Sequence, residues 1–429
     1  MKKQLPWMLM AVLALPTFAA KKPAPGPSAQ DAAVLEQIKA LNQIPEAELN
    51  ESSDPTLPAL RKIIDIDGPE FLRVRRLAGQ AAVRAPLNPG TRALLAGLVS
   101  PRWDAYAIAG SLWLSALRTT NEDLREKARR KMVQFIQPGH IPELIRLLND
   151  PVAAKPAYEI LKEVTGQRLS PDSKAWTAWW TKNKTKVDIV GHLLADTRAQ
   201  LSRHPIQPFN HDRLWYVPDG VRDKAMAYKD RSPQEQELIH QWNVWAEEQV
   251  RVFVDSWAQI KPVIERLTHH PDPRVNQFLI SLLADPSYGD YAAIVLAWRQ
   301  NVDALGDLRA SYASYQTVGR ALARGSLGDT EALVNLLQMV DHAGPRPLSY
   351  GIMDDDLRSR VTSLKSVGVL PAEEAFELLC HRNFGFGSAE TGKEKMKRLQ
   401  KAKKWLQENA RNLIFDSRRG YFTVAPSAH

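Results

Sequence analysis

Cysteine is almost absent from this chain, and the one that it has, Cys380, cannot form an internal disulfide. The fold therefore depends on its hydrophobic core rather than on covalent cross-links, even in an oxidising compartment. Cys380 follows Glu377-Leu378-Leu379, beside an apolar helix face, and no motif of a thiol enzyme surrounds it. We interpret it as a buried and unreactive thiol.

The sequence also lacks the short motifs that mark many hydrolases and metal enzymes, such as HExxH, a cysteine–histidine cluster or a GxSxG elbow. His269 and His270 are adjacent in a turn, so they cannot easily share one tetrahedral metal ion. Gly387–Glu394 fits the G-x-x-x-x-G-K pattern of a phosphate loop, but Glu394 stands where Ser or Thr would bind magnesium. Asp354–Asp356 is typical of the acidic start of a helix. We therefore predict no catalytic residue, cofactor or metal.

Long hydrophobic runs are missing, except for Leu5–Phe18, which follows the basic start Met1-Lys2-Lys3. This pattern predicts a secretory signal peptide over residues 1–19, with the mature chain starting at Ala20. The run is shorter than the roughly 20 residues of a spanning helix. A lipoprotein would need a cysteine at the cleavage point. We expect a soluble periplasmic or secreted protein whose residues 20–30 form a flexible tether.

Acidic residues are fewer than basic ones, which gives a net charge of +9, or +7 once Lys2 and Lys3 are removed with the signal. The basic residues are spread along the chain, and only Lys393–Lys404 forms a short cluster. Export argues against a nucleic-acid partner. The anionic partners within reach of an exported protein are phospholipid head groups and wall polymers, so peripheral contact with either is the corresponding expectation.

From about Asp31, short amphipathic patterns broken by Pro, Gly and Asp predict helices, with almost no strand signal before the C-terminus. One joint recurs, in which an apolar helix ends, a short polar side chain caps the next helix, and proline fits its first turn. It occurs at Leu98–Pro101, Leu147–Pro151 and Leu282–Pro286, with a variant at Gly328–Thr330. Ser232-Pro233-Gln234-Glu235 has the form of a capping box and predicts a long helix that Pro262 ends or bends. Leu413–Asp416 and Tyr421–Val424 predict a small β-hairpin.

A second repetition joins distant parts of the chain, because Ala157–Leu161 matches Ala375–Leu379. Each segment is followed by a glycine-bearing loop and by a helix with a tryptophan, Trp179 in the first copy and Trp405 in the second. We expect both copies to form a helix, a loop and a helix, with Tyr158 equivalent to Phe376 and both tryptophans buried. Asp188 and Asp416 close the two copies. We call these segments, Ala157–Asp188 and Ala375–Asp416, the first and second closing units.

This repetition predicts two tandem helical arrays, over residues 31–190 and 232–424. An irregular connector over 191–231 joins them, because Pro205, Pro208 and Pro218 stand there among isolated aromatics. The hairpin ends the second array, and residues 425–429 form a tail.

The stretch Ile141–Lys184, with its Leu-Leu-x-Asp-Pro joint and Trp176, Trp179 and Trp180, resembles bacterial envelope proteins of the HEAT-repeat type. The resemblance is looser over Pro371–Val424. In that family a helix with a W-x-x-W-W pattern often closes an array. The resemblance implies an irregular α-solenoid whose stacked helices expose a concave surface for binding proteins, and it implies no chemistry.

Two functions follow from these expectations. The first is a non-enzymatic scaffold or adaptor of the envelope that binds a protein partner along its helical-repeat surfaces. The alternative is a protein that binds or hydrolyses cell-wall polysaccharide with its tryptophan-rich units. Large aromatics at helical spacing usually pack in a core, which favours the first. A wall hydrolase would present a deep cleft with at least two convergent carboxylates, whereas a scaffold would present a broad groove.

Overall fold

The computed structural model of the chain describes residues 106–204, 211–221, 228–268, 270–346, 348–353, 355–364, 369–389, 391–417 and 420–425, with residues 36, 43, 89 and 91. The predicted signal peptide, the tether and the joint at Leu98–Pro101 lie outside the described residues, as do His269 and Asp354. Among the described residues, no helix is both long and apolar enough to cross a membrane.

The N-terminal half of the described chain is a succession of short helices. They are α5 (Tyr106–Ala116), α6 (Glu122–Gln134), α7 (Ile141–Leu147), α8 (Ala154–Thr165), α9 (Ser173–Asn183), α10 (Ile189–Arg203) and α11 (His211–Trp215). A 3₁₀ turn, η3 (Pro138–His140), precedes α7, and another, η4 (Tyr228–Asp230), follows α11.

The C-terminal half begins with one long helix and continues with short ones. The helices are α12 (Pro233–Thr268), α13 (Pro273–Leu282), α14 (Gly289–Trp298), α15 (Leu305–Ser314), α16 (Val318–Gly325), α17 (Glu331–His342), α18 (Asp355–Leu364), α19 (Ala372–Leu379) and α20 (Gly392–Asn409). The 3₁₀ turns are η5 (Val302–Ala304), η6 (Ser349–Gly351) and η8 (Phe386–Ser388). The strands are β1 (Leu413–Asp416) and β2 (Tyr421–Val424).

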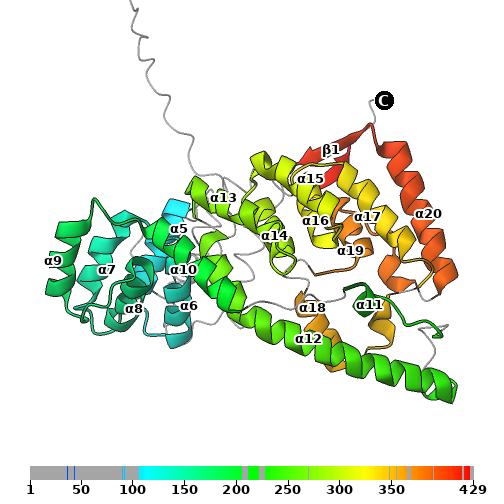
Figure 1. Ribbon diagram of the computed structural model, residues 1–429, viewed down its shortest axis with the longest axis horizontal. Coiled ribbons are helices and arrows are strands. Elements are labelled where there is room, and N and C mark those ends of the chain that lie inside the picture. Colours follow the sequence, from blue (N-terminus) through cyan, green and yellow to red (C-terminus); the bar gives the residue numbers. More distant parts are fainter. Residues whose placement is uncertain are drawn as a thin grey trace, which may run out of the picture.

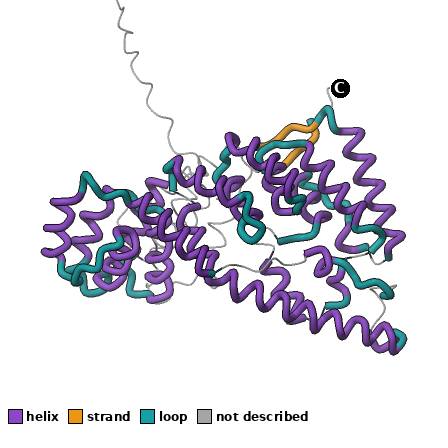
Figure 2. Tube along the Cα trace, viewed as in Figure 1, coloured by secondary structure: helices purple, strands orange, loops and turns teal. Residues whose placement is uncertain are grey.

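The helices stack in the order of the chain. In the N-terminal half, α6 packs on α8 and α8 packs on α10, while α7 contacts both α8 and α9. In the C-terminal half, α14 packs on α16, which in turn contacts α17 and α19. In these pairs each helix packs against a neighbour close to it in the chain, which is the packing of a solenoid. The long helix α12 differs, because it contacts α6 and α18 as well as α10. The predicted mostly all-α, solenoid-like fold is confirmed (Figures 1 and 2).

Two of the predicted joints form turns that an aspartate side chain holds, but Pro151 and Pro286 lie before α8 and α14 rather than in their first turns, and neither helix has a side-chain cap. At the joint after α7, Asp150 accepts the backbone N–H groups of Val152 and Ala153, at 2.9 and 3.0 Å. At the joint after α13, Asp285 accepts those of Ser287 and Tyr288, at 2.8 and 3.2 Å. A carboxylate at this point satisfies N–H groups that have no partner inside the next helix and favours its positive end. The same local chemistry therefore turns the chain in both halves.

The long helix α12 starts at the predicted capping box. The Glu235 N–H donates to the Ser232 hydroxyl at 3.3 Å, and the Ser232 N–H donates to the Glu235 carboxylate at 3.4 Å. Pro262 does not end the helix, which continues to Thr268. Ile260 and Ile264, on either side of the proline, are fully buried. Burial of this apolar stripe stabilises the helix beyond the proline.

The segment predicted as an irregular connector, 191–231, is partly helical. It includes all but the start of α10 and the short helix α11, so this prediction needs correction. Of the prolines that suggested irregular structure, Pro218 stands outside both helices, and Pro205 and Pro208 lie outside the described residues. Proline excludes helix at its own position, but it leaves the residues between two prolines free to form a turn of helix. Leu214 and Trp215, in that turn, are buried.

The hydrophobic core does not divide at this segment. One cluster of buried side chains runs from Leu112 to Val369 and includes Leu201 and Trp215 from the predicted connector. A smaller cluster, from Ala321 to Phe422, lies under α17, α19, α20 and the hairpin. The two clusters interleave along the chain, because α17 belongs to the smaller one and α18 to the larger one. The larger cluster includes side chains from both of the ranges 31–190 and 232–424.

Three polar contacts join α11 to the helices around it. The indole N–H of Trp242, on α12, donates to the Arg213 carbonyl at 3.1 Å. The Ser349 hydroxyl donates to the Leu214 carbonyl at 2.7 Å, and Tyr216 pairs with Leu348 in an isolated bridge. In Figure 1, α11 and α18 lie between the long arm of α12 and the C-terminal helices.

The predicted β-hairpin is confirmed. β1 and β2 pair antiparallel, with Leu413 opposite Val424 and Phe415 opposite Phe422. Phe422 is 1% exposed, and β2 packs against α19. The hairpin thus covers the end of the helical stack, where no further helix pair follows in the described chain.

Candidate functional site

The first closing unit contains the tryptophans that the sequence singled out. Trp176 is fully buried, whereas Trp179, Trp180 and Tyr158 are half-buried. The rings of Tyr158 and Trp176 meet edge to face, with centroids 6.5 Å apart and planes at 81°. The Trp176 indole N–H donates to the Ser170 carbonyl at 3.0 Å, so its only polar atom is satisfied.

The second closing unit places Phe376 and Trp405 in the same relation. Phe376 is fully buried, Trp405 is 8% exposed, and their rings meet edge to face at 6.4 Å and 85°. Phe384 adds a further ring, 5.4 Å from that of Trp405. Both units consist of a helix, a loop with a glycine in the left-handed conformation, and a second helix.

The prediction that Trp179 is the buried tryptophan of the first unit was wrong. Trp176 makes the contact with Tyr158 that Trp405 makes with Phe376, and Trp179 packs on the outer side of Trp176, with ring centroids 5.7 Å apart. Helical spacing places these rings near one face, but the neighbouring helix decides which ring it covers. Trp179 instead lines a recess of about 220 Å³ with Asn183, Lys186 and His192.

A larger cavity, of about 680 Å³, lies among α11, α14, α16, α17 and the start of α19. This volume falls within the range of about 300–1,000 Å³ that is typical of ligand pockets. The cavity combines aromatic and carboxamide side chains with three ionisable ones. These lining residues are Trp215, Tyr216, Tyr312, Gln316, Asn335, Gln338, Asp290, His342 and Arg346.

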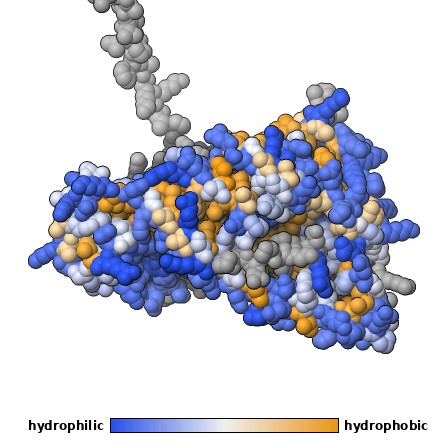
Figure 3. Space-filling model, in the orientation of Figure 1, coloured by the Kyte–Doolittle hydropathy of each residue, from blue (hydrophilic) through white to orange (hydrophobic). Residues whose placement is uncertain are grey.

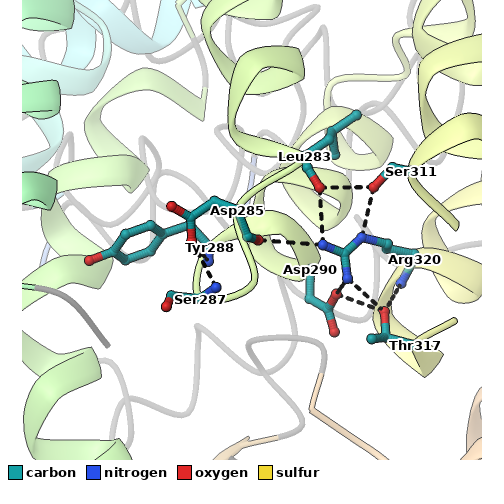
Figure 4. A network of polar contacts seen from close by, with 8 residues as sticks. All are labelled: Leu283, Asp285, Ser287, Tyr288, Asp290, Ser311, Thr317 and Arg320. Carbon is teal, nitrogen blue, oxygen red and sulfur yellow. Dashed lines mark hydrogen bonds and ion pairs between the residues drawn. The ribbon is translucent and has the colours of Figure 1, made fainter. Parts of the chain in front are cut away.

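One wall of the cavity is organised by Arg320, which is 1% exposed (Figure 4). Its Nη1 donates to the Asp290 carboxylate at 2.6 Å, and its Nη2 donates to the Leu283 carbonyl at 3.0 Å. Its Nε donates to the Ser311 hydroxyl at 2.8 Å. Gly289 leaves room for the guanidinium, because a Cβ there would collide with Arg320 Nη2. The network fixes the joint between α13 and α14 and neutralises Asp290.

Another wall is backed by a buried ion pair. Tyr216 lines the cavity, and its hydroxyl donates to the Glu373 carboxylate at 3.1 Å. Glu373 and Lys395 are almost completely buried and pair at 2.8 Å. The Lys395 ammonium lies 4.2 Å from the centre of the Tyr216 ring, an attractive cation–π contact. Burial lowers the pKa of Lys395, and the charge of Glu373 opposes that shift. The pair ties α11, α19 and α20 together behind the cavity.

The third wall is the outer face of α17. Leu333, Leu336, Leu337 and Val340 are buried on the inner face of this helix. Asn335, Gln338 and His342, which line the cavity, follow one another at spacings of three and four on the other face. None of these three side chains makes a hydrogen bond or ion pair within the described part of the protein. Their donors and acceptors are therefore available to a ligand.

The remaining residues that the sequence singled out have structural roles. Cys380 is 5% exposed, and burial raises the pKa of its thiol well above the usual range. The Gly387–Glu394 motif leads into α20, where Thr391 caps the helix by accepting the Glu394 N–H. His270 is buried, and burial lowers its pKa to about 4. Asp355 and Asp356 stand in the first turn of α18, as predicted.

No group of three or more His, Cys, Asp or Glu residues in the described chain is placed to hold a metal ion. The sequence did not single out any residue of the large cavity. Its walls come from five separated segments, and each residue is of a type common on solvent-facing helices. The only local signal is the polar face of α17, and such a face is found on most amphipathic helices.

Comparisons with protein-family models, with curated proteins and with solved structures found no match to this chain.

Proposed function

We propose that this chain is exported and acts in the cell envelope as a non-enzymatic scaffold or adaptor, binding a protein partner in the cavity among α11, α14, α16, α17 and α19. The N-terminal sequence Met1–Ala20, with its basic start and short apolar run, supports export. The resemblance of Ile141–Lys184 to envelope HEAT-repeat proteins supports a binding role. Neither argument depends on catalytic chemistry.

The observation that carries the proposal is the character of the cavity walls. The side chains of Asn335 and Gln338 are carboxamides with unused hydrogen-bonding capacity. Among the described lining residues, the one carboxylate, Asp290, is paired with Arg320 at 2.6 Å. A glycosidase needs two carboxylates on opposite sides of the bond that it cleaves. Carboxamides, in contrast, bind without reacting, and each offers both a donor and an acceptor. These walls are suited to holding a ligand.

The described surface seen in Figure 3 shows no single large hydrophobic patch that would compete with the cavity as a binding site. On the face shown in Figure 3, hydrophilic residues predominate and hydrophobic ones appear in separate patches. The exposed large hydrophobic residues of the described chain are distributed over several helices, as Val244, Trp298 and Leu378 illustrate. Scattered apolar residues are normal for a protein surface. The cavity is therefore the strongest candidate for specific binding.

Site-specific photo-crosslinking in the producing cells tests this proposal. A photoreactive amino acid at Gln338, on the cavity face of α17, should form a covalent adduct with a polypeptide. The matched control is the same amino acid at Gln241, which is exposed on α12 and does not line the cavity. Adducts of equal yield at both positions, or none at Gln338, would contradict the proposal.

The alternative, binding of wall polysaccharide, keeps one specific observation in its favour. Trp179 exposes part of its ring in the recess of about 220 Å³ beside the polar side chains of Asn183 and Lys186. Aromatic faces beside polar groups suit sugars. If the protein sediments with insoluble cell wall and Trp179→Ala abolishes that sedimentation, while Gln338 forms no polypeptide adduct, the alternative replaces the proposed function.

A further inference from the structure

The charged groups that are described in the large cavity leave it with an uncompensated positive charge. Among its described lining residues, Asp290, His342 and Arg346 have side chains of the acidic and basic types. Asp290 is neutralised by the buried guanidinium of Arg320. Arg346 has no such partner, because its Nε donates to the Ala343 carbonyl at 3.2 Å and its two terminal nitrogens make no hydrogen bond or ion pair within the described residues.

The buried carboxylate of Glu373, behind the cavity, does not balance the charge of Arg346. Glu373 is paired with Lys395 at 2.8 Å and accepts the Tyr216 hydroxyl at 3.1 Å. The Lys395 ammonium also donates to the backbone carbonyl of Arg346 at 2.9 Å. One negative and two positive charges therefore meet at this side of the cavity. An entering anion would find a net attraction.

Arg346 is also held in position. Its guanidinium carbon lies 5.5 Å from the centre of the Tyr216 ring, and its Nε is tied to the end of α17. A guanidinium fixed over an aromatic ring keeps its outer N–H groups free, and these match the two oxygens of a carboxylate. Less side-chain freedom is lost on binding when the donor is already placed.

We propose that this cavity binds an acidic peptide segment of the partner, with an Asp or Glu side chain paired to Arg346 and peptide groups bonded to the carboxamides of Asn335 and Gln338. The inference rests on the proposed function and names its ligand class. Carboxamides carry a donor and an acceptor each, as peptide groups do, and Tyr312 and Met339 offer apolar contact for neighbouring side chains. A free carboxylate alone would leave this hydrogen-bonding capacity unused.

Fluorescently labelled hexapeptide pools test the ligand class. Both pools are acetylated and amidated at their ends and random in sequence, except for a central position that is Glu in one pool and Gln in the other. Fluorescence anisotropy with the full chain should show tighter binding of the Glu pool by about tenfold or more, the effect of one charge-assisted bidentate contact. Equal binding of the two pools would overturn the inference.

Variants then assign the preference to its residue. Arg346→Gln should remove the preference for the Glu pool. Arg346→Lys should retain only part of it, because lysine keeps the positive charge but lacks the two parallel N–H donors of the guanidinium. The matched control is Arg251→Gln, which makes the same change of charge on α12, where Arg251 pairs with Glu248. A preference that survives Arg346→Gln, or is lost equally in Arg251→Gln, would overturn the inference. Melting curves of each variant show whether it is folded.

The outcomes also separate this inference from the proposed function. If Gln338 forms polypeptide adducts and the two pools bind equally, the cavity binds a protein through other chemistry and the acidic peptide is excluded. If Gln338 forms no adduct and neither pool binds, both proposals fail. Adducts at Gln338 together with an Arg346-dependent preference for the Glu pool support both.

Discussion

The two closing units reach the same aromatic packing with different loops. In each, a ring on the first helix meets a tryptophan on the second edge to face, at 6.5 Å for Tyr158 and Trp176 and at 6.4 Å for Phe376 and Trp405. The first loop runs from Gly166 to Asp172, whereas the second runs from Cys380 to Thr391 and includes the turn η8. The helical packing is thus kept while the connection varies.

The two loops are held by different side chains, and the rings beside them differ in polarity. In the first unit, the Tyr158 hydroxyl donates to the Leu169 carbonyl at 2.9 Å, so the ring itself anchors the loop. Phe376 has no hydroxyl, and the neighbouring Glu377 takes over this task. Its carboxylate accepts the N–H groups of Phe384 and Gly385, at 2.6 and 2.9 Å. The short loop thus accepts hydrogen bonds from the side chains of Tyr158 and Trp176, and the longer loop donates several N–H groups to one carboxylate.

The two units are also followed by different elements, and these elements cover the apolar surface of each unit. The first continues into α10, which packs on α8 and gives the unit a further helix as its neighbour. The second ends in the hairpin, where the buried ring of Phe422 packs next to Phe415, with centroids 5.2 Å apart. A solenoid exposes apolar surface wherever its last repeat has no neighbour. At the C-terminal end of this chain, two short strands cover that surface.

The largest effect that we expect comes from removing the shared aromatic contact. Trp176→Ala and Trp405→Ala should each lower the free energy of unfolding by about 3–5 kcal/mol, the range for truncating a buried aromatic residue. Chemical denaturation of the two variants measures this. If the units are equivalent, the two losses agree within about 1 kcal/mol, the spread that is common for one kind of substitution.

Two further substitutions serve as controls for that experiment. Trp179→Ala should cost less than Trp176→Ala, because Trp179 is only half-buried. Trp298 is 47% exposed, and Trp298→Ala should cost less than about 1 kcal/mol. If Trp179→Ala proves more costly than Trp176→Ala, Trp179 rather than Trp176 is the counterpart of Trp405.

The loops should respond unequally to loss of their anchors. Glu377→Ala removes an acceptor that two close N–H groups share, and we expect it to lower the free energy of unfolding by about 2 kcal/mol. Tyr158→Phe removes one hydrogen bond and should cost about 1 kcal/mol. Thermal unfolding of the two variants compares them. Glu377→Gln, which keeps one acceptor oxygen, should lie between Glu377→Ala and the unchanged protein.

The reverse ranking, with Tyr158→Phe the more damaging, would show that the longer loop does not depend on its carboxylate. Hydrogen exchange of the Phe384 amide in Glu377→Ala locates the effect, because that amide loses its acceptor and should exchange faster. An unchanged exchange rate at this amide would mean that water replaces the carboxylate without cost.

The elements that were predicted from the sequence are those that depend on local chemistry. The joints at Asp150 and Asp285 follow from a short polar side chain before proline, since such a turn needs only the next few N–H groups. The capping box at Ser232 and the hairpin at Leu413–Val424 are equally local. The match between Ala157–Leu161 and Ala375–Leu379 identified two units with the same order of elements, because the apolar spacing of the first helix is repeated.

What depends on distant parts of the chain was not predicted. Trp176 and Trp179 are indistinguishable by spacing, and the choice between them is made by the ring of Tyr158 on a different helix. The cavity was missed for the same reason, because Asn335 and Arg346 become neighbours of Tyr216 only in the folded chain. Asp188 and Asp416, which the sequence match pairs, also differ in structure. Asp188 is the N-cap of helix α10, whereas Asp416 is the last residue of strand β1.

That difference has a measurable consequence in acid. Asp188 accepts the Gly191 N–H at 3.0 Å as the cap of α10, and Arg274 donates to both of its oxygens, at 2.6 and 2.9 Å. The hydrogen bonds from Arg274, and then that from Gly191, lower the pKa of Asp188 from its ordinary value of 3.8 to about 2. The folded state binds this proton less tightly than the unfolded chain does. The Asp188 carboxylate therefore makes its full contribution to the free energy of unfolding above about pH 4, and that contribution is lost as the pH falls towards 2.

The smallest effect that we expect is therefore a pH-dependent one at Asp188. Asp188→Asn should lower the free energy of unfolding by less than about 1 kcal/mol at neutral pH, since the side chain is 54% exposed and solvent screens its ion pair. Denaturation curves of the variant and the unchanged protein should converge as the pH is lowered from 4 to 2. The double variant Asp188→Asn with Arg274→Gln tests the cause. Arg274→Gln loses its pair with Asp272, at 2.8 Å, in either background, but it should cost less in the Asp188→Asn background, where its pair with Asp188 is already absent. A difference between Asp188→Asn and the unchanged protein that stays constant down to pH 2 would show that the difference does not come from the ionised carboxylate of Asp188.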